Sequence, residues 1–176
     1  MIETLKKQAA KLIARRVLRP FRFQERNFST VYERSFSFLI MMPLDERDFR
    51  FATELLTFLK NNKKTLFILT YDYRVSLLPP NLKTNVIEHG VNDLNKLQLP
   101  SKKLLNRLNE IHFDVVIDMN RTELLFYNYI INSVKSGIKL GFARPNSDKY
   151  FNLQVVNNES NPEISYRNLL NCFKMF

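Results

Sequence analysis

The sequence is poor in the residues that most metal-binding and phosphate-binding motifs require. It has one cysteine, two histidines and three glycines in 176 residues. The histidines and the cysteine do not form a cluster at metal-ligand spacing, and three glycines leave no glycine-rich phosphate loop. We therefore expect neither a metal nor a bound cofactor. His89 and His112 are expected at the surface or at helix ends, and Cys172 as a packing residue.

Long apolar runs and a secretion signal are also missing. No window approaches 18 uninterrupted apolar residues, so no transmembrane helix is expected. The N-terminus lacks the apolar run and the cleavage site of a signal peptide, and the single cysteine excludes an internal disulfide. These absences predict a cytoplasmic protein. With 45% hydrophobic residues in 176, the chain is expected to fold as one domain with a full core.

Charge is the feature that the sequence has in excess. The net charge is +10, and residues 1–34 hold nine lysines and arginines against three glutamates. Up to about Leu18 the apolar residues fall on one helical face, and Pro20 ends the predicted helix. This basic amphipathic arm, 1–34, is either a helix in a membrane interface or a helix packed on the domain. Its predicted anion-binding or membrane-binding residues are Lys6, Lys7, Lys11, Arg15, Arg16, Arg19, Arg22 and Arg26.

The remainder of the chain, 35–176, alternates apolar strands with amphipathic helices. Strands are predicted at 36–42, 65–70, 85–88, 113–118 and 137–142, with an edge strand at 150–156. Helices are predicted at 48–60, 101–111, 122–133 and 162–176. This alternation is typical of a single α/β Rossmann-like domain, with a mostly parallel sheet and helices on both faces.

Charged residues gather where the predicted strands end. Open parallel sheets bind ligands at the carboxyl ends of their strands, and a rim of carboxylates and arginines suits a polar or phosphorylated ligand. The simpler interpretation is that Asp48 and Asp118 only cap helices. The predicted ligand rim consists of Asp45, Asp48, Asp72, Arg74, Asp118, Arg121 and Arg144.

Four segments, in order, resemble the N-terminal, acceptor-side half of bacterial glycosyltransferase family 9, the heptosyltransferase family of lipopolysaccharide assembly. They are FLIMMPLDERDFRFATELLTFLK (38–60), FDVVID (113–118) with KLGF (139–142), KYFNLQV (149–155) and EISYRNLL (163–170). The resemblance implies one half of a GT-B fold. It also implies that Asp48 stands where the family has a general base acting on the acceptor hydroxyl. Arg47 replaces the family's glycine before that aspartate, and Glu163 replaces a histidine.

The resemblance ends where the family's nucleotide-sugar-binding domain should begin. Half a cleft cannot orient donor against acceptor, so this chain should not transfer sugar by itself. The expected function is that of a glycosyltransferase-like half-protein, at the inner face of an anionic membrane or with a partner chain that supplies the donor site. The alternative is a non-enzymatic scaffold whose basic arm binds nucleic acid or a protein complex.

Overall fold

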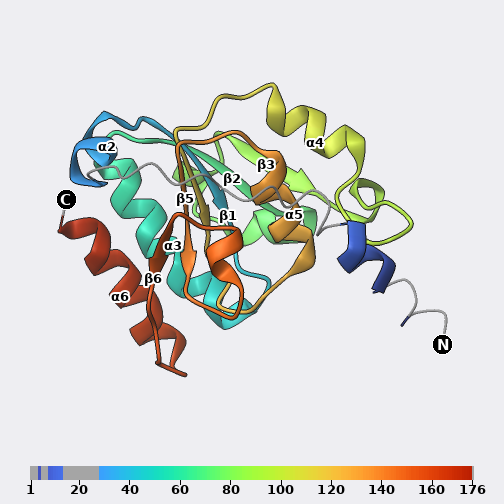
Figure 1. Cartoon of the computed structure of the whole chain (residues 1–176). Coiled ribbons are helices and arrows are strands. Elements are labelled where there is room, and N and C mark those ends of the chain that lie inside the picture. The colour runs from blue at the N-terminus through green and yellow to red at the C-terminus, as the bar shows by residue number, and fades with distance from the viewer. Residues whose placement is uncertain (1–3, 5–7, 14–27, 176) are drawn as a thin grey trace.

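The computed structural model describes residues 4, 8–13 and 28–175, which form an α/β domain (Figure 1). The strands are β1 (Ser37–Met41), β2 (Thr65–Tyr71), β3 (Val86–His89), β4 (Val115–Asp118), β5 (Ile138–Phe142) and β6 (Leu153–Val155). The α-helices are α2 (Phe28–Arg34), α3 (Glu46–Asn61), α4 (Lys102–Asn109), α5 (Leu125–Ser133) and α6 (Pro162–Lys174). Single-turn or short 3-10 helices occupy Asp72–Leu77, Pro80–Leu82, Val91–Asp93 and Ser147–Lys149. Residues 8–13 are also helical.

The six strands form one parallel sheet in the order β3-β2-β1-β4-β5-β6. This is the strand order of a doubly wound Rossmann-like fold, so the predicted fold class is confirmed. From β1, the chain adds β2 and β3 on one side and β4, β5 and β6 on the other, so the direction of winding reverses between β1 and β4. Ligands of doubly wound sheets bind beside that point, at the carboxyl ends of the strands.

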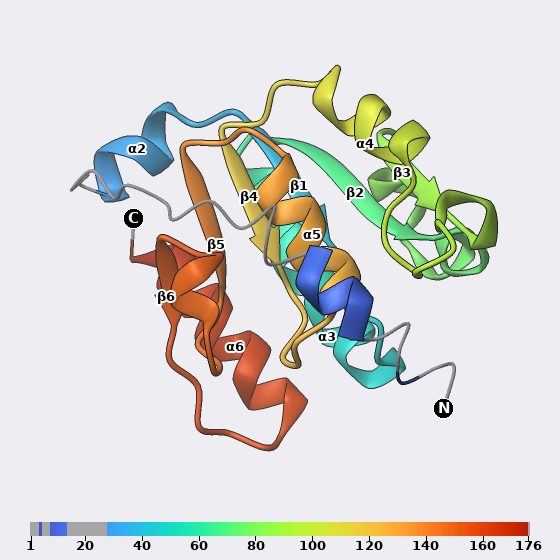
Figure 2. The ribbon, with the colours of Figure 1, turned by 45° about the vertical axis from the view of Figure 1, so that its right-hand side comes forward.

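The sheet lies between two apolar cores, and successive side chains of β1 point to opposite faces of the sheet. Phe38 and Ile40 belong to one core, where α3 packs against α6, whereas Leu39 and Met41 belong to the other. The second core is covered by α4 and α5, and Figure 2 shows α5 crossing in front of the central strands. A strand buried on both faces reads as a continuous apolar run, which is why β1 and β4 were recognisable in the sequence.

The last seven residues of the predicted arm, 28–34, are part of the body of the domain. Residues 28–34 form α2, and Tyr32 is buried against Phe38 and Phe173, with ring centroids 6.2 and 5.7 Å away. The Lys64 ammonium donates to the carbonyls of Tyr32 (2.9 Å) and Ser35 (2.8 Å) at the end of this helix. Residues of α2, which were predicted to belong to the arm, therefore contribute to the core of the domain.

The described part of the N-terminal helix rests on the domain through a small residue. Ala10 is only 2% exposed, whereas Leu12 and Ile13 are 61% and 40% exposed. Lys11 is exposed. The other predicted arm cations lie outside the described residues: Lys6, Lys7, Arg15, Arg16, Arg19, Arg22 and Arg26. Within the ranges that the structure describes, no helix is long and apolar enough to cross a membrane.

Candidate functional site

The loops that follow β1 and β4 lie side by side at the point where the strand order reverses, and Asn120 joins them. Its Oδ1 accepts from the backbone N–H of Leu44 (2.9 Å), and its Nδ2 donates to Oδ1 of Asp118 (2.7 Å). Asn120 is buried. The carboxyl edge of the sheet is thus bridged by a side chain where other doubly wound folds open toward a ligand.

Asp48 does not cap α3, although it was a candidate for that role. The cap is Asp45, whose Oδ1 accepts from the backbone N–H groups of Arg47 (2.9 Å) and Asp48 (3.0 Å). A carboxylate at this position satisfies amides that the first helical turn leaves free. The Asp48 side chain is therefore available for another partner.

That partner is Arg121, in the loop after β4. Nε of Arg121 donates to Oδ2 of Asp48 (3.0 Å) and Nη2 donates to its Oδ1 (3.0 Å), so both carboxylate oxygens are bonded. The Asp48 side chain is only 7% exposed. Hydrogen bonding to Asp48 raises the pKa of Arg121 above its ordinary value. Nη1 of Arg121 also donates to the Ser160 carbonyl (3.0 Å), which ties this pair to the loop before α6.

Asp118 and Arg144 form a second, more deeply buried pair. Nη2 of Arg144 lies 2.6 Å from Oδ2 of Asp118, and the two side chains are 5% and 0% exposed. Nη1 of Arg144 donates to the carbonyls of Asn120 (2.8 Å) and Thr122 (2.7 Å). Oδ1 of Asp118 accepts from the backbone N–H of Asn120 (3.0 Å), which is a local turn and not a helix cap, because α5 begins only at Leu125.

Arg74 holds the loop after β1 from the other side. Its Nη1 donates to the Pro43 carbonyl (3.2 Å), and its guanidinium carbon lies 5.7 Å from the centroid of the Phe49 ring. The predicted rim residue Asp72 follows β2 and is exposed, whereas the other six predicted rim residues gather in this network at the expected edge of the sheet. The structure pairs or caps them with one another and with loop carbonyls, and this stabilises the edge.

A cavity of about 710 Å³ opens beside this network, and we call it the α5 cavity. It lies where β1 and β2 end, against the start of α5 and the described N-terminal helix. None of the seven predicted rim residues lines it. Its walls include Lys11, Leu44, Tyr71, Lys96 and residues 123–127.

The α5 cavity has an aromatic wall formed by Tyr71, Phe126 and Tyr127, which pack against His89; His89 itself is not part of the lining. The His89 ring lies between Tyr71 (centroids 4.2 Å apart) and Phe126 (4.8 Å, planes 29° apart), and its Nε2 is 3.3 Å from the Tyr127 hydroxyl. The ring is buried, and burial lowers the pKa of His89 to about 4, so it is neutral at neutral pH. The expectation that His89 lies at the surface or a helix end is wrong. The alternation along β3 carried the missed signal, since Ile87 and His89 point inward while Glu88 is exposed.

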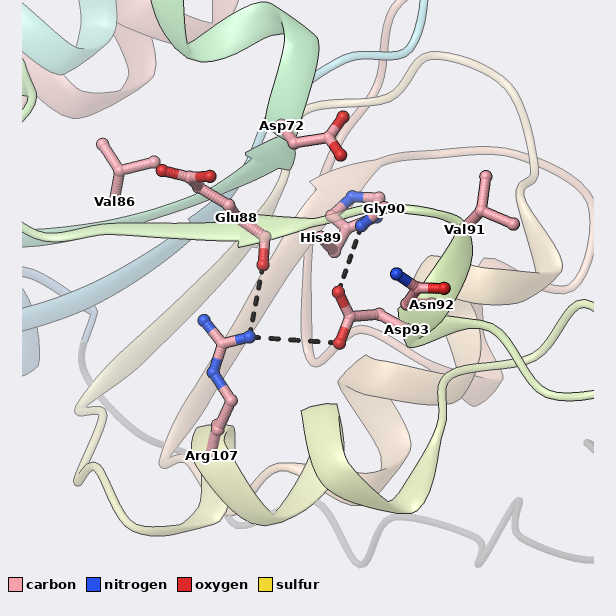
Figure 3. A pocket seen from close by; sticks show the side chains of 9 residues that line it. All are labelled: Asp72, Val86, Glu88, His89, Gly90, Val91, Asn92, Asp93 and Arg107. Carbon is pink, nitrogen blue, oxygen red and sulfur yellow. Dashed lines mark hydrogen bonds and ion pairs between the residues drawn. The ribbon is translucent and has the colours of Figure 1, made fainter.

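A second, smaller hollow of about 340 Å³ lies at the end of β3 (Figure 3). Figure 3 shows the Arg107 guanidinium pointing to the Glu88 carbonyl (3.4 Å) and the Asp93 carboxylate (4.0 Å). A Cβ on Gly90 would lie 2.4 Å from Oδ2 of Asp72, so a larger residue here would require the exposed Asp72 side chain to move. No group of three or more potential metal ligands occurs among the residues that the structure describes.

Comparison with known proteins gives one match. The model of a family of unknown function, DUF6913, matches residues 5–176. No curated protein and no solved structure matches the chain. The matched segment includes every strand of the sheet and both paired arginines.

Proposed function

The chain belongs to the DUF6913 family, and we propose that it is a glycosyltransferase-family-9-like half-domain that does not catalyse sugar transfer itself and works with a partner protein. The observation that carries this proposal is the Asp48–Arg121 pair. The resemblance puts Asp48 in the place of the general base. A general base must reach the acceptor hydroxyl with an accessible oxygen, and here the Asp48 side chain is only 7% exposed and both its oxygens accept hydrogen bonds from one guanidinium.

The distribution of exposed apolar side chains supports a partner at the carboxyl edge. In two-domain proteins of the GT-B type this edge faces the second domain. Six of the large hydrophobic residues that are exposed in the described part of the chain lie in the segments that follow β1, β2, β3 and β6, where a partner could bury them. They are Leu44, Tyr73, Leu77, Val91, Val156 and Ile164.

Calorimetric titration with a nucleotide-linked heptose tests the catalytic part of the proposal. We expect neither binding heat nor release of free nucleotide from the purified chain. The Asp48→Asn variant should behave identically, because the carboxylate has no chemical role. Turnover by the wild-type chain that Asp48→Asn abolishes would overturn the proposal.

Site-specific photo-crosslinking in the native cells tests the partner. A benzoylphenylalanine at Tyr73 lies two residues after the carboxyl end of β2, whereas the same group at Phe36 lies just before β1, on the opposite edge, and serves as a matched control because both positions are 63% exposed. We expect one discrete protein adduct from position 73 and none from position 36. Equal labelling at both positions, or no adduct at position 73, contradicts an interface at this edge.

A second candidate is peripheral binding at the inner face of the cytoplasmic membrane. It is favoured by Lys11, which lies beside the exposed Leu12 and Ile13 on the N-terminal helix. The protein should then float with anionic vesicles and not with neutral ones, and Lys11→Glu with Lys6→Glu and Lys7→Glu should abolish flotation. Flotation that these charge reversals do not change argues against a membrane role for the arm.

A further inference from the structure

We propose that the α5 cavity binds a small aromatic anion, that is, a planar ring carrying a phosphate, sulfate or carboxylate group. This goes beyond the proposed function. It uses none of the charged pairs at the edge of the sheet, and it does not depend on whether a partner protein binds there.

The size and position of the cavity suit a small organic molecule. Its volume of about 710 Å³ falls within the range of about 300 to 1,000 Å³ that is typical of small-molecule sites. Leu44 and Tyr71 place it at the carboxyl ends of β1 and β2, and residues 123–127 follow β4. This is the region in which doubly wound sheets bind their ligands.

The aromatic side of the cavity favours a planar ring. Tyr71 and Phe126 both line the cavity and are half-buried, and the His89 ring packed between them fixes their positions. The neutral His89 puts no charge behind this wall. Tyr127 also lines the cavity and is buried, and its ring centroid lies 5.2 Å from that of Phe126 in an edge-to-face contact. Rigid aromatic surfaces of this kind stabilise a ring by stacking.

The charged residues of the lining favour an anion. Lys11 and Lys96 have no hydrogen-bond or ion-pair partner among the described residues. The one acidic residue, Glu123, already accepts from Nδ2 of Asn128 (3.0 Å) and from the Tyr150 hydroxyl (3.5 Å). No side chain caps α5 at Leu124, so the positive end of its dipole adds to the two lysines. An anionic group on the ligand would neutralise this excess of positive charge.

Calorimetric titration of the full chain tests the proposed ligand class. The probes are AMP, UMP and 4-nitrophenyl phosphate, with adenosine as the uncharged ring and ribose 5-phosphate as the ringless anion. We expect at least one of the three aromatic anions to bind, and adenosine and ribose 5-phosphate to bind at least about tenfold more weakly, since ring stacking and a charged contact each contribute on that scale. Failure of all three aromatic anions, or equal binding of the ringless anion, overturns the proposal.

Substitutions in the lining locate the site. Lys96→Ala and Phe126→Leu should each weaken binding by about tenfold. The matched controls are Lys103→Ala, on the exposed side of α4, and Phe36→Leu, at the opposite edge of the sheet, and both should leave the affinity unchanged. Thermal unfolding of each variant separates loss of binding from loss of folding. If the controls weaken binding as much as the lining variants, the anion binds elsewhere and the cavity is not the site.

Discussion

Asp48 and Arg121 are 73 residues apart in the chain and meet with both carboxylate oxygens bonded. Because Asp48 is almost fully buried, removing its partner leaves a buried charge without compensation. We expect Arg121→Leu to lower the free energy of unfolding by about 3 kcal/mol, measured by urea denaturation, and Asp48→Asn in the same chain to restore part of that loss.

The exposed pair of Arg50 and Glu46 offers the matched control, since it lies on the same helix with side chains 78% and 67% exposed. Arg50→Leu should change the free energy of unfolding by only about 0.5 kcal/mol or less. A loss at Arg121 that is no larger than this would mean that the buried pair contributes little to stability.

His89 makes stability depend on pH between about 4 and 6.5. Its pKa is lowered to about 4 in the folded state, so the unfolded chain takes up a proton first as the pH falls. The stability that neutral His89 contributes is therefore fully present above the pKa that the residue has in the unfolded chain, and it is lost as the pH falls toward 4. We expect a loss of about 2 kcal/mol between pH 7.5 and pH 5.0, measured by urea denaturation at both pH values.

Carboxylates also titrate at acid pH, so the informative quantity is the difference between variants. His89→Gln should remove most of this pH-dependent loss. His112→Gln changes a side chain that is 86% exposed, so this variant should show the same pH-dependent loss as the wild type. If the two variants show the same pH dependence, burial of His89 does not control the acid response.

At the scale of elements, Gly141 in β5 lets the strand pack closely against Phe151, in the segment between β5 and β6. A Cβ on Gly141 would lie 2.4 Å from Cζ of the buried Phe151 ring. We expect Gly141→Ala to destabilise the fold by about 2 kcal/mol through overpacking, measured by thermal or urea unfolding. A double-mutant cycle with Phe151→Leu should give a coupling of at least about 0.5 kcal/mol, because the smaller side chain relieves the clash. Additive losses would show that the ring is not the obstacle.

Helix α2 is attached to the sheet by Lys64, the residue immediately before β2. Its ammonium donates to Tyr32 and Ser35 carbonyls and lies 4.6 Å from the centroid of the Tyr32 ring. We expect Lys64→Met to cost about 2 kcal/mol and to speed amide exchange in residues 28–34. Lys63→Met, at the adjacent exposed position, is the control and should leave both measurements unchanged.

For the molecule as a whole, the exposed apolar residues in the segments after β2 and β3 are predicted to serve association and not folding. Leu77 and Val91 are 54% and 83% exposed, whereas the nearby Leu82 is buried. Leu77→Asn and Val91→Asn should each change the free energy of unfolding by about 0.5 kcal/mol or less. Leu82→Asn should cost more than about 2 kcal/mol in the same urea experiment. A large loss from Leu77→Asn would assign that residue to the core and weaken the case for an interface.

The sequence predicted the fold better than it predicted the site, for a physical reason. Buried parallel strands such as β1 and β4 are apolar on both faces, so they stand out as local runs, and the residues at their ends can be placed on one edge. Which of those residues pair is a long-range property. Arg121 and Arg144 were both placed on the ligand rim, but their hydrogen bonds to Asp48 and Asp118 depend on how three loops pack. His89 was missed because a four-residue strand gives a weak alternation signal.

The placement of Arg121 also bears on how such a chain can change during evolution. Asp48 belongs to a helix that packs the core, whereas Arg121 lies in a loop, so the two positions differ in how freely they can be substituted. Replacing Arg121 alone would leave a carboxylate with free oxygens at the same place in the same fold. The stability lost in that step opposes the appearance of a free carboxylate at this edge. A variant already stabilised elsewhere would tolerate the substitution better.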